Sequence, residues 1–343
     1  MPGRSKERST GLEIEFSQST MEAHMRHFSF FLLLSFCVFL NQSSARTNIW
    51  QQLDAPNGGI TLTLIASQQD VFAGTLGGGV FRSPDHGRSW QEVNNGLSDK
   101  DVMALMSDGN GYLFAGTFGG GVFRSTDIGN TWKAVNTGLF SNEVVSLCRD
   151  ERGSLYAGTS ENGVFTSTNL GESWQQVGLS GFYVNSILDH PRSGLFASTD
   201  NDGLFRSSDK GKTWKKILDK GLNKSKITGL TSDKDGVVFA ATNDNGVYVS
   251  YNGGQTWSNK SSGLENKFVG ILAMENDGSL FAGTAAGIFR SNDRGNSWRK
   301  VVTGLTDMSV RSLAIDSIGR LFVGPLQGGV FRGSPTIAET YFK

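Results

Sequence analysis

The sequence is poor in cysteine, histidine and proline, and it carries no excess charge. Among 343 residues there are two cysteines, four histidines and six prolines, and 32 basic residues balance 32 acidic ones. A neutral chain without a basic block is a poor partner for nucleic acid or for an anionic membrane surface. Because Cys37 falls in a leader segment, Cys148 would be the single cysteine of a mature chain, which excludes an intramolecular disulfide. With His86 and His190 as the remaining histidines, a thiolate or multi-histidine zinc cluster is excluded too, and we expect neither a metal nor another cofactor.

The sequence also lacks an apolar run long enough to span a membrane. Its longest run, "FSFFLLLSFCVFL" at residues 28–40, has 13 residues, whereas a spanning helix needs about 20. The run follows a short basic segment containing Arg26 and precedes small residues ending at Ala45, which is typical of a secretory signal peptide. We therefore expect a leader over residues 1–45 with cleavage after residue 45, no stable membrane span after cleavage, and a secreted or periplasmic protein. The alternative is a signal anchor that stays in the membrane.

Glycine and aromatic residues are abundant instead, and they recur at a regular spacing. The 45 glycines and 23 phenylalanines favour β structure. Tryptophan recurs at positions 90, 132, 174, 214, 257 and 298, a period near 42 residues. Within one unit, residues 102–135 read as four short strands, "VMALMSD", "YLFAGT", "GVFRST" and "TWKAV", joined by turns rich in Gly, Asn and Asp. Four strands in a repeat of this length predict a β-propeller blade.

The number of blades follows from the second strand of the repeat. Its "FAGT"-like sequence occurs seven times, at positions 72, 114, 156, 196, 239, 281 and 322, and an apolar residue opens a first strand twelve residues before each. The seventh unit runs out after its third strand, but "NIWQQL" at residues 48–53 matches the fourth strand of the other units. We therefore predict an all-β, seven-bladed propeller of four-stranded blades, closed by the N-terminal strand joining the C-terminal blade. It is expected as a monomer over residues 46–335, with blades at 60–95, 102–137, 144–178, 184–219, 227–262, 269–303 and 310–334 plus 47–53, and a tail at 336–343.

Six units carry a turn motif, Ser-x-Asp/Asn-x-Gly-x-Ser/Thr-Trp. The turn motif resembles the Asp-box, or bacterial neuraminidase repeat, of sialidase-like propellers, and the chain is similar to photosystem II stability/assembly factor-like exported propellers. We expect its Asp or Asn to accept hydrogen bonds from backbone N–H groups two residues on, its glycine to supply a positive φ, and its tryptophan to be buried between neighbouring sheets. Asn at two of the six positions rules out a catalytic carboxylate as the common role. These structural residues are Asp85, Asp127, Asn169, Asp209, Asn252, Asp293, Trp90, Trp132, Trp174, Trp214, Trp257 and Trp298.

The resemblance to sialidases does not extend to their active site. Sialidases hold a carboxylate with three arginines from different blades and carry a Phe-Arg-Ile-Pro motif. The segment Phe81-Arg82-Ser83-Pro84 comes nearest to it, but it lacks the isoleucine and runs directly into a turn motif. No catalytic residue is therefore assigned. The arginines at this third-strand position are expected to pack against a neighbouring strand, and they are Arg82, Arg124, Arg206, Arg290 and Arg332.

A ligand site is expected where the blades differ from one another. The second residue of the innermost strand varies from glycine to arginine and should line the mouth of the central channel, at Thr61, Met103, Val145, Asn185, Thr228, Gly270 and Arg311. The loops between second and third strands should open on the same face, and in blades three to five they are acidic. The predicted ligand-binding sector comprises Glu161, Asp200, Asp202, Asp244, Phe182, Tyr183, Asn185, Thr228 and Arg311. The alternative is that these are ordinary turn residues in exposed loops.

These features favour an exported, non-catalytic propeller that recognises a protein or carbohydrate ligand at this face, as a binding or assembly module. One alternative is a glycoside hydrolase of the sialidase-like or xyloglucanase-like propeller type, with a carboxylate pair such as Asp200 and Asp244. Another is a structural module without a ligand of its own. Cys148 is expected to be a buried small hydrophobe rather than a reactive thiol.

Overall fold

The computed structural model describes residues 50–53, 59–219, 221–222, 225–301 and 309–333, all within a compact unit spanning Asn48–Lys343. The expected leader at residues 1–45 and the expected tail at residues 336–343 lie outside the described residues. Within the described ranges no helix is long and apolar enough to cross a membrane.

Seven antiparallel sheets of four strands form the described fold, and six of them follow the order of the chain. Blade 1 contains β2 (Thr61–Ser67), β3 (Asp70–Thr75), β4 (Gly79–Ser83) and β5 (Gln91–Glu92). Blade 2 contains β6 (Val102–Ser107), β7 (Leu113–Thr117), β8 (Val122–Ser125) and β9 (Lys133–Ala134). Blade 3 contains β10 (Val144–Arg149), β11 (Leu155–Thr159), β12 (Val164–Ser167) and β13 (Gln175–Gly178). Blade 4 contains β14 (Val184–His190), β15 (Gly194–Thr199), β16 (Gly203–Ser207) and β17 (Lys215–Lys216).

The remaining three blades repeat the same arrangement. Blade 5 contains β18 (Ile227–Ser232), β19 (Val238–Thr242), β20 (Val247–Ser250) and β21 (Ser258–Asn259). Blade 6 contains β22 (Val269–Met274), β23 (Leu280–Thr284), β24 (Gly287–Ser291) and β25 (Arg299–Lys300). Blade 7 contains β26 (Val310–Ile315), β27 (Leu321–Pro325), β28 (Phe331–Gly333) and, from the other end of the chain, β1 (Trp50–Gln52).

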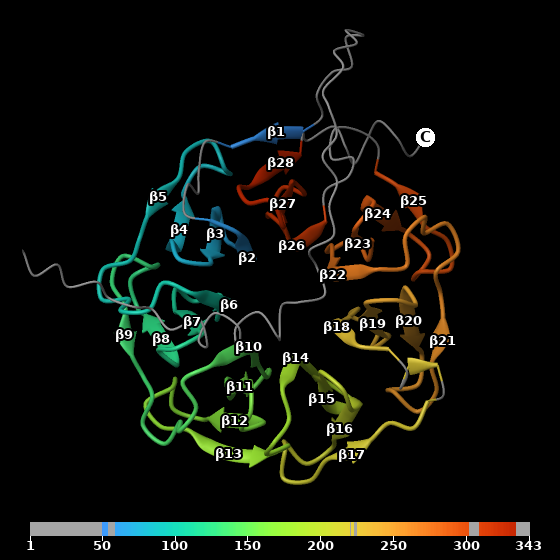
Figure 1. The fold of residues 1–343 in the computed structure, drawn as a ribbon, viewed down its shortest axis with the longest axis horizontal. Coiled ribbons are helices and arrows are strands. Elements are labelled where there is room, and N and C mark those ends of the chain that lie inside the picture. The colour runs from blue at the N-terminus through green and yellow to red at the C-terminus, as the bar shows by residue number, and fades with distance from the viewer. Residues whose placement is uncertain (1–49, 54–58, 220, 223–224, 302–308, 334–343) are drawn as a thin grey trace, which may run out of the picture. The chain divides into compact units, whose positions relative to one another are not determined.

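The N-terminal strand β1 closes the ring. It pairs antiparallel with β28, with Trp50 opposite Gly333 and Gln52 opposite Phe331. Figure 1 shows the seven sheets around a central axis, with β2, β6, β10, β14, β18, β22 and β26 innermost. The predicted seven-bladed propeller and its closure by the N-terminal strand are therefore confirmed.

The core lies between neighbouring blades. The second strand is buried along its length, as in β7, where Phe114 is fully buried. At Gly116 a Cβ would come within 2.7 Å of the Val144 side chain of blade 3, so only glycine allows the two sheets to approach this closely. Trp132 also joins two blades, because its indole Nε1 donates a hydrogen bond to the Val93 carbonyl of blade 1 at 2.8 Å. Apolar packing and this hydrogen bond together fix the angle between successive sheets.

The turn motif forms a hydrogen-bonded loop between the third and fourth strands. In blade 2 the Asp127 carboxylate accepts the backbone N–H of Thr131 at 2.8 Å and its hydroxyl at 2.6 Å. The donors are four residues on, so the prediction of donors two residues on is wrong. The reason is the backbone conformation, because Ile128 and Gly129 both have positive φ, 59° and 85°, and turn the chain back towards the carboxylate.

Every innermost strand contains a β-bulge at its second residue. The register shifts between Val144 and Ser146 in blade 3, and at the corresponding place in the other six blades. A bulge residue has no cross-strand partner, which re-aims its side chain. In blade 1 the bulge falls at Leu62, whereas Thr61, which was predicted to line the mouth of the channel, is fully buried. The prediction missed by one residue because the hairpin between β2 and β3 is shorter than in the other blades.

Candidate functional site

The candidate site lies at the edge of the ring where the innermost strands begin, which we call the channel edge. The loops between second and third strands lie at the same edge, since the backbone N–H of Asp200 donates to the Tyr183 carbonyl at 3.1 Å. The same link joins Asn243 to Lys226 in blade 5, at 3.0 Å. The opposite edge carries the hairpins between first and second strands and the turn motifs, and we call it the hairpin edge.

Four side chains of blades 4, 5 and 7 lie at the channel edge, on or next to the start of an innermost strand or on the adjoining loop. Asp200 forms an ion pair with Lys226. Burial raises the pKa of the Tyr183 phenol to about 12, with the charges of Asp200 and Glu143 adding to the increase and that of Arg311 opposing it. Loss of hydration lowers the pKa of Arg311, and Tyr183 opposes that change. Tyr183, Asp200, Lys226 and Arg311, which we call the channel-edge cluster, thus share one electrostatic environment although they come from three blades.

The bulge residues of blades 4 and 5 face the next blade. Asn185 Nδ2 donates a hydrogen bond to the Ile227 carbonyl at 3.5 Å, and Thr228 Oγ1 donates one to the Val269 carbonyl. Their side chains therefore help to join successive innermost strands. Both remain half-buried, so their outer atoms still contribute to the channel edge.

The other members of the predicted sector are spread more widely. Asp202 pairs with Lys216 on the outermost strand β17, at 3.3 Å, which directs it to the rim of the ring. The Phe182 ring packs on Phe205, with 5.4 Å between centroids, and is half-buried. Glu161 and Asp244 are exposed on the loops of blades 3 and 5. The structure thus places Asp200, Tyr183 and Arg311 in one electrostatic environment, whereas Asp202 is directed to the rim and Glu161 and Asp244 are exposed on the loops of other blades.

Sequence reasoning left Glu143 out of the predicted sector, and it placed Lys226 next to that sector. Both lie near the start of an innermost strand, as Tyr183 does, immediately before Val144 and Ile227. A comparison of the residue that precedes the innermost strand in each blade could have found Glu143. Lys224, which also belongs to this stretch, lies outside the described residues.

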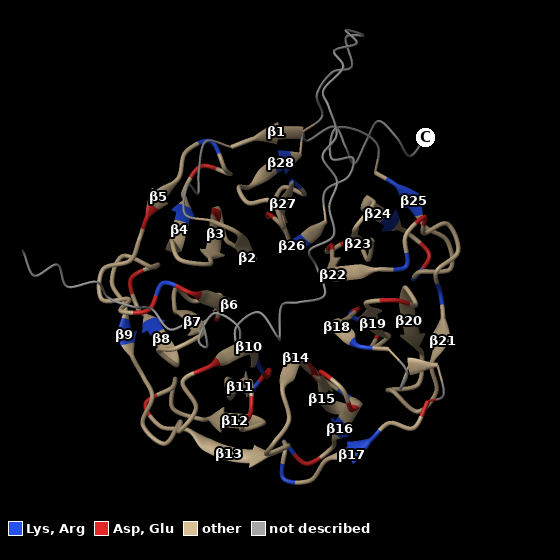
Figure 2. Cartoon of the chain, viewed as in Figure 1, with Lys and Arg blue, Asp and Glu red and all other residues tan. Residues whose placement is uncertain are grey.

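The charges of the described residues do not gather in one place. Figure 2 shows acidic and basic residues interspersed around the ring. Within the described ranges no three His, Cys, Asp or Glu side chains are grouped so as to hold a metal ion. Cys148 packs against the core between blades 3 and 4, and burial raises the pKa of its thiol to about 12.

Comparison with known proteins places the chain among propellers. Residues 96–227 match a family described as the DUF6242 beta propeller domain. No curated protein sequence matches the chain. Among solved structures it is similar to an ancestral GH74 enzyme, with 18% identity and a TM-score of 0.68 over 84% of this chain and 46% of that chain. It is similar to YCF48 bound to D1 peptide, with 16% identity and a TM-score of 0.68 over 84% of this chain and 97% of that chain.

A third similar structure is virginiamycin B lyase from Staphylococcus aureus, with 13% identity and a TM-score of 0.70 over 82% of this chain and 97% of that chain. At these identities the likeness shows the seven-bladed fold alone, and the three proteins have different functions. The chain spans about half the length of the GH74 enzyme but nearly the full length of YCF48 and of the lyase.

Proposed function

We propose that this chain is an exported, non-catalytic recognition module that binds a protein segment at the channel edge. The observation that carries the proposal is the channel-edge cluster, in which Tyr183, Asp200, Lys226 and Arg311 offer both charges and an aromatic ring in one sector. Such a mixture of polar and aromatic groups suits an extended peptide with side chains of varied character. Export rests on the apolar run at residues 28–40 and its flanks.

The state of the acidic side chains supports binding over hydrolysis. A glycosidase needs two carboxyl groups facing each other across the scissile bond, one to donate a proton and one to act as a base or nucleophile. Asp200 and Asp202 are instead each ion-paired with a lysine, and the Lys216 that pairs with Asp202 lies on the outermost strand. Two of the four predicted carboxylates therefore each have a lysine, and not a second carboxyl group, as their partner.

The peptide-bound relative supports the same choice of ligand. YCF48 bound to D1 peptide has nearly the length of this chain, so a propeller of this size is sufficient for peptide binding in that protein. The GH74 enzyme is about twice as long, and this chain matches less than half of it. Recognition by a single ring is the function that the comparisons favour.

A pair of arrays tests the proposal. The full chain is applied to an array of synthetic peptides and to a glycan array, and dissociation constants are then measured for the best peptide. We expect peptide binding that weakens about tenfold or more in Arg311→Gln and in Asp200→Ala/Asp244→Ala, the loss expected for a central interface residue.

The matched control is Asp209→Asn, which changes a turn motif at the hairpin edge and should leave peptide binding unchanged. Binding of glycans alone, or hydrolysis of a xyloglucan oligosaccharide, would contradict the proposal. So would peptide binding that both channel-edge variants leave intact.

A further inference from the structure

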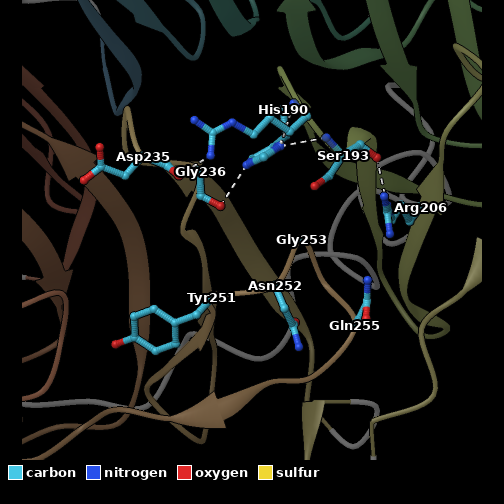
Figure 3. Close-up of a pocket in the computed structure, with 10 residues that line it drawn as sticks. His190, Ser193, Arg206, Asp235, Gly236, Tyr251, Asn252, Gly253 and Gln255 are labelled. Atoms are coloured by element: carbon cyan, nitrogen blue, oxygen red, sulfur yellow. Dashed lines mark hydrogen bonds between the residues drawn. The ribbon is translucent and has the colours of Figure 1, made fainter.

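A pocket at the hairpin edge lies between blades 4 and 5. It is at the opposite end of the strands from the channel-edge cluster. Its volume is about 290 Å³. Blade 4 contributes Arg192 and Arg206, and blade 5 contributes Asp235, Asn252, Gly253 and Gln255. Figure 3 shows Arg206, Asp235, Asn252, Gly253 and Gln255 around the opening, with Arg206 and Gln255 on the same side of it.

The pocket exists where the turn of blade 5 departs from the other turns. In every turn motif the residue after the Asp or Asn has a positive φ, and in five of six it carries a side chain. Three of these side chains contact the hairpin of the preceding blade: His86 reaches Asp316 at 2.9 Å, Lys210 reaches Asp150 at 3.0 Å, and Arg294 reaches Asp233 at 2.8 Å. Blade 5 has Gly253 at this position, where a Cβ would collide with Ser193 Oγ. No side chain therefore extends from this position of the turn over the hairpin of blade 4.

The hairpin of blade 4 is also unusual. In blade 3 the Asp150 carboxylate accepts the backbone N–H groups of Arg152 and Ser154. In blade 4 the buried His190 takes this place, and its Nδ1 accepts the N–H groups of Arg192 and Ser193 at 3.2 and 2.9 Å. Since Nδ1 accepts, the proton is on Nε2, which lies 2.9 Å from the Gly236 carbonyl of blade 5 and donates to it. The histidine thus replaces a negative charge with a neutral ring.

Arg206 is held in place at the wall of this pocket. Its Nε donates a hydrogen bond to the Ser193 carbonyl at 2.8 Å, and its guanidinium lies over the Phe196 ring, 5.9 Å from the centroid. Among the residues that the structure describes, no carboxylate pairs with it and its two terminal nitrogens make no hydrogen bond. A guanidinium that is already oriented loses little freedom when a ligand binds.

The arginine at the equivalent position of the third strand has a carboxylate partner in three other blades. Arg82 pairs with Asp70 at 3.1 Å and Arg290 pairs with Asp277 at 3.1 Å. Arg124 of blade 2 pairs with Glu172 of the blade 3 turn at 2.7 Å. Glu172 follows the turn glycine, and the residue at that position in blade 5 is Gln255, an amide. In blades 1, 2 and 6 a carboxylate therefore neutralises the third-strand arginine. Between blades 4 and 5 an uncharged amide stands where Glu172 stands between blades 2 and 3.

The remaining charges around the pocket favour an anion. Arg192 lies at the opening and donates to the Asp235 carbonyl at 3.3 Å. The Asp235 carboxylate is the acidic group of the pocket, and it is ion-paired with Arg294 of blade 6. Arg192 and Arg206 are thus left as the cations that an incoming negative group would meet.

We propose that this pocket binds a carboxylate group, which pairs with Arg206 in the way that Glu172 pairs with Arg124. In that pair one terminal nitrogen of Arg124, Nη2, donates to Glu172 at 2.7 Å, while Nη1 donates to the Leu170 carbonyl. Both terminal nitrogens of Arg206 can donate to an incoming carboxylate, which allows the side-by-side geometry that arginine favours. It could be supplied by an acidic side chain or C-terminus of a bound chain, or by a free organic acid. This site is separate from the channel edge and goes beyond the proposed function.

Titration with sodium acetate tests the site directly. Acetate is added to the isotopically labelled full chain, with sodium chloride at equal ionic strength as the reference, and the amide resonances of Ser193 and Gly253 are followed by NMR. We expect saturable shifts with acetate and none with chloride. Arg206→Gln should weaken acetate binding about ten- to a hundred-fold, the range for a hydrogen-bonded charged group.

The matched control is Arg124→Gln, which removes the same arginine in a blade where the carboxylate is already present, and it should leave acetate binding unchanged. Equal shifts with chloride, no shifts in the wild-type chain, or an unchanged dissociation constant in Arg206→Gln would each overturn the proposal.

A second variant supplies the missing carboxylate within the chain. Gln255→Glu places a carboxylate where blade 3 has Glu172, so we expect a higher melting temperature and loss of the acetate shifts. Acetate binding that persists in the folded Gln255→Glu protein would overturn the proposal even if Arg206→Gln does not fold.

Short peptides then identify the source of the carboxylate. Acetyl-Gly-Gly-Glu-amide and acetyl-Gly-Gly-Gly with a free C-terminus are compared with acetyl-Gly-Gly-Gln-amide, which has no carboxylate. Tighter binding of one acidic peptide than of acetate supports that source, and equal affinity for all carboxylates supports a free organic acid. Equal binding of the uncharged peptide would contradict recognition of a carboxylate.

Discussion

The residue that follows the Asp or Asn of each turn motif links local geometry to contacts between blades. Its φ is 57° in His86, 62° in Lys210 and 66° in Gly253. The hydrogen bonds of the turn fix this backbone, so the side chain is free to differ from blade to blade. Where it is long and polar it reaches the neighbouring hairpin, as Lys210 reaches Asp150. Where it is absent, at Gly253, a pocket is present instead.

Ile128 is the turn residue whose type fits this conformation least well. A β-branched side chain at a φ of 59° is strained, whereas asparagine tolerates it. Ile128 is 38% exposed, so little apolar burial is lost on substitution. We expect Ile128→Asn to raise the free energy of unfolding by about 0.5–1 kcal/mol. Urea denaturation measures this, and Ile128→Val, which keeps the β-branch, should give no gain. A destabilised Asn variant would contradict the argument.

The Asp209 carboxylate should make one turn sensitive to acid. The hydroxyl and backbone N–H of Thr213 and the hydroxyl of Ser207 donate to the carboxylate, and together they lower its pKa from 3.8 to about 2. Because the folded pKa lies below the unfolded one, this stabilisation is present above about pH 4 and is lost as the pH falls towards about 2.

Asp209→Asn tests this, because asparagine already serves in the turns of blades 3 and 5, where Asn169 Oδ1 accepts the Ser173 N–H at 3.0 Å. We expect the stability advantage of the wild type over Asp209→Asn, measured by urea denaturation, to shrink as the pH is lowered from about 5 to about 2. A difference that stays constant across this range would show that the carboxylate does not contribute in this way.

At the scale of elements, the tryptophans differ in how they join neighbouring sheets. Trp132 donates to the Val93 carbonyl at 2.8 Å and is 5% exposed. Trp90 packs at the equivalent place between blades 7 and 1, but its buried Nε1 has no hydrogen-bond partner among the described residues.

The comparison of Trp132→Phe with Trp90→Phe separates the hydrogen bond from the ring. Both substitutions remove similar volume, but only the first leaves a buried carbonyl unsatisfied. We expect Trp132→Phe to lower the free energy of unfolding by about 1–2 kcal/mol more than Trp90→Phe does. Equal losses in the two variants, measured by chemical denaturation, would mean that the Val93 bond contributes nothing to stability.

The elements could be predicted because their residues repeat, and the contacts between them could not. The strands and turns follow from local pattern, so the blade number and the closing strand β1 were accessible from the sequence. The channel-lining position of blade 1 was predicted at Thr61, but the shorter hairpin places the bulge at Leu62. The pair His86 and Asp316 joins residues 230 positions apart, and nothing near either residue indicates the other. The pocket was missed for the same reason, since it depends on Gly253 facing a hairpin of another blade.

At the scale of the molecule, a sevenfold repeated ring acquires function where its blades stop being equivalent. Blades 4 and 5 depart from the pattern at both edges. At the channel edge Asp200 of blade 4 pairs with Lys226 at the start of blade 5. At the hairpin edge Arg206 and Gly253 form parts of one pocket. Both proposed sites therefore include residues of the interface between these two blades, and the channel-edge cluster extends from it to Arg311 of blade 7.

Closure of the ring is the feature on which all seven interfaces depend. Trp50 and Leu53 of the N-terminal segment are 6% and 7% exposed, and the Leu53 N–H donates to the Val330 carbonyl at 2.9 Å. Arg332 of β28 is hydrogen-bonded to Gln51 and to the His86 carbonyl of blade 1, so β1 and blade 1 are held by the same strand. Without β1, β28 would present an unpaired edge.

Two deletions test the contribution of this strand. Removal of residues 1–53 takes away β1, and the loss of the Trp50 ring alone should cost about 3–5 kcal/mol. We expect a much lower melting temperature and aggregation through the exposed edge of β28. Removal of residues 1–47 keeps β1 and serves as the reference, so its melting temperature should be much the higher of the two. If the two deletions unfold at the same temperature, the N-terminal strand does not stabilise the ring, because the second differs from the first by little more than the closing strand.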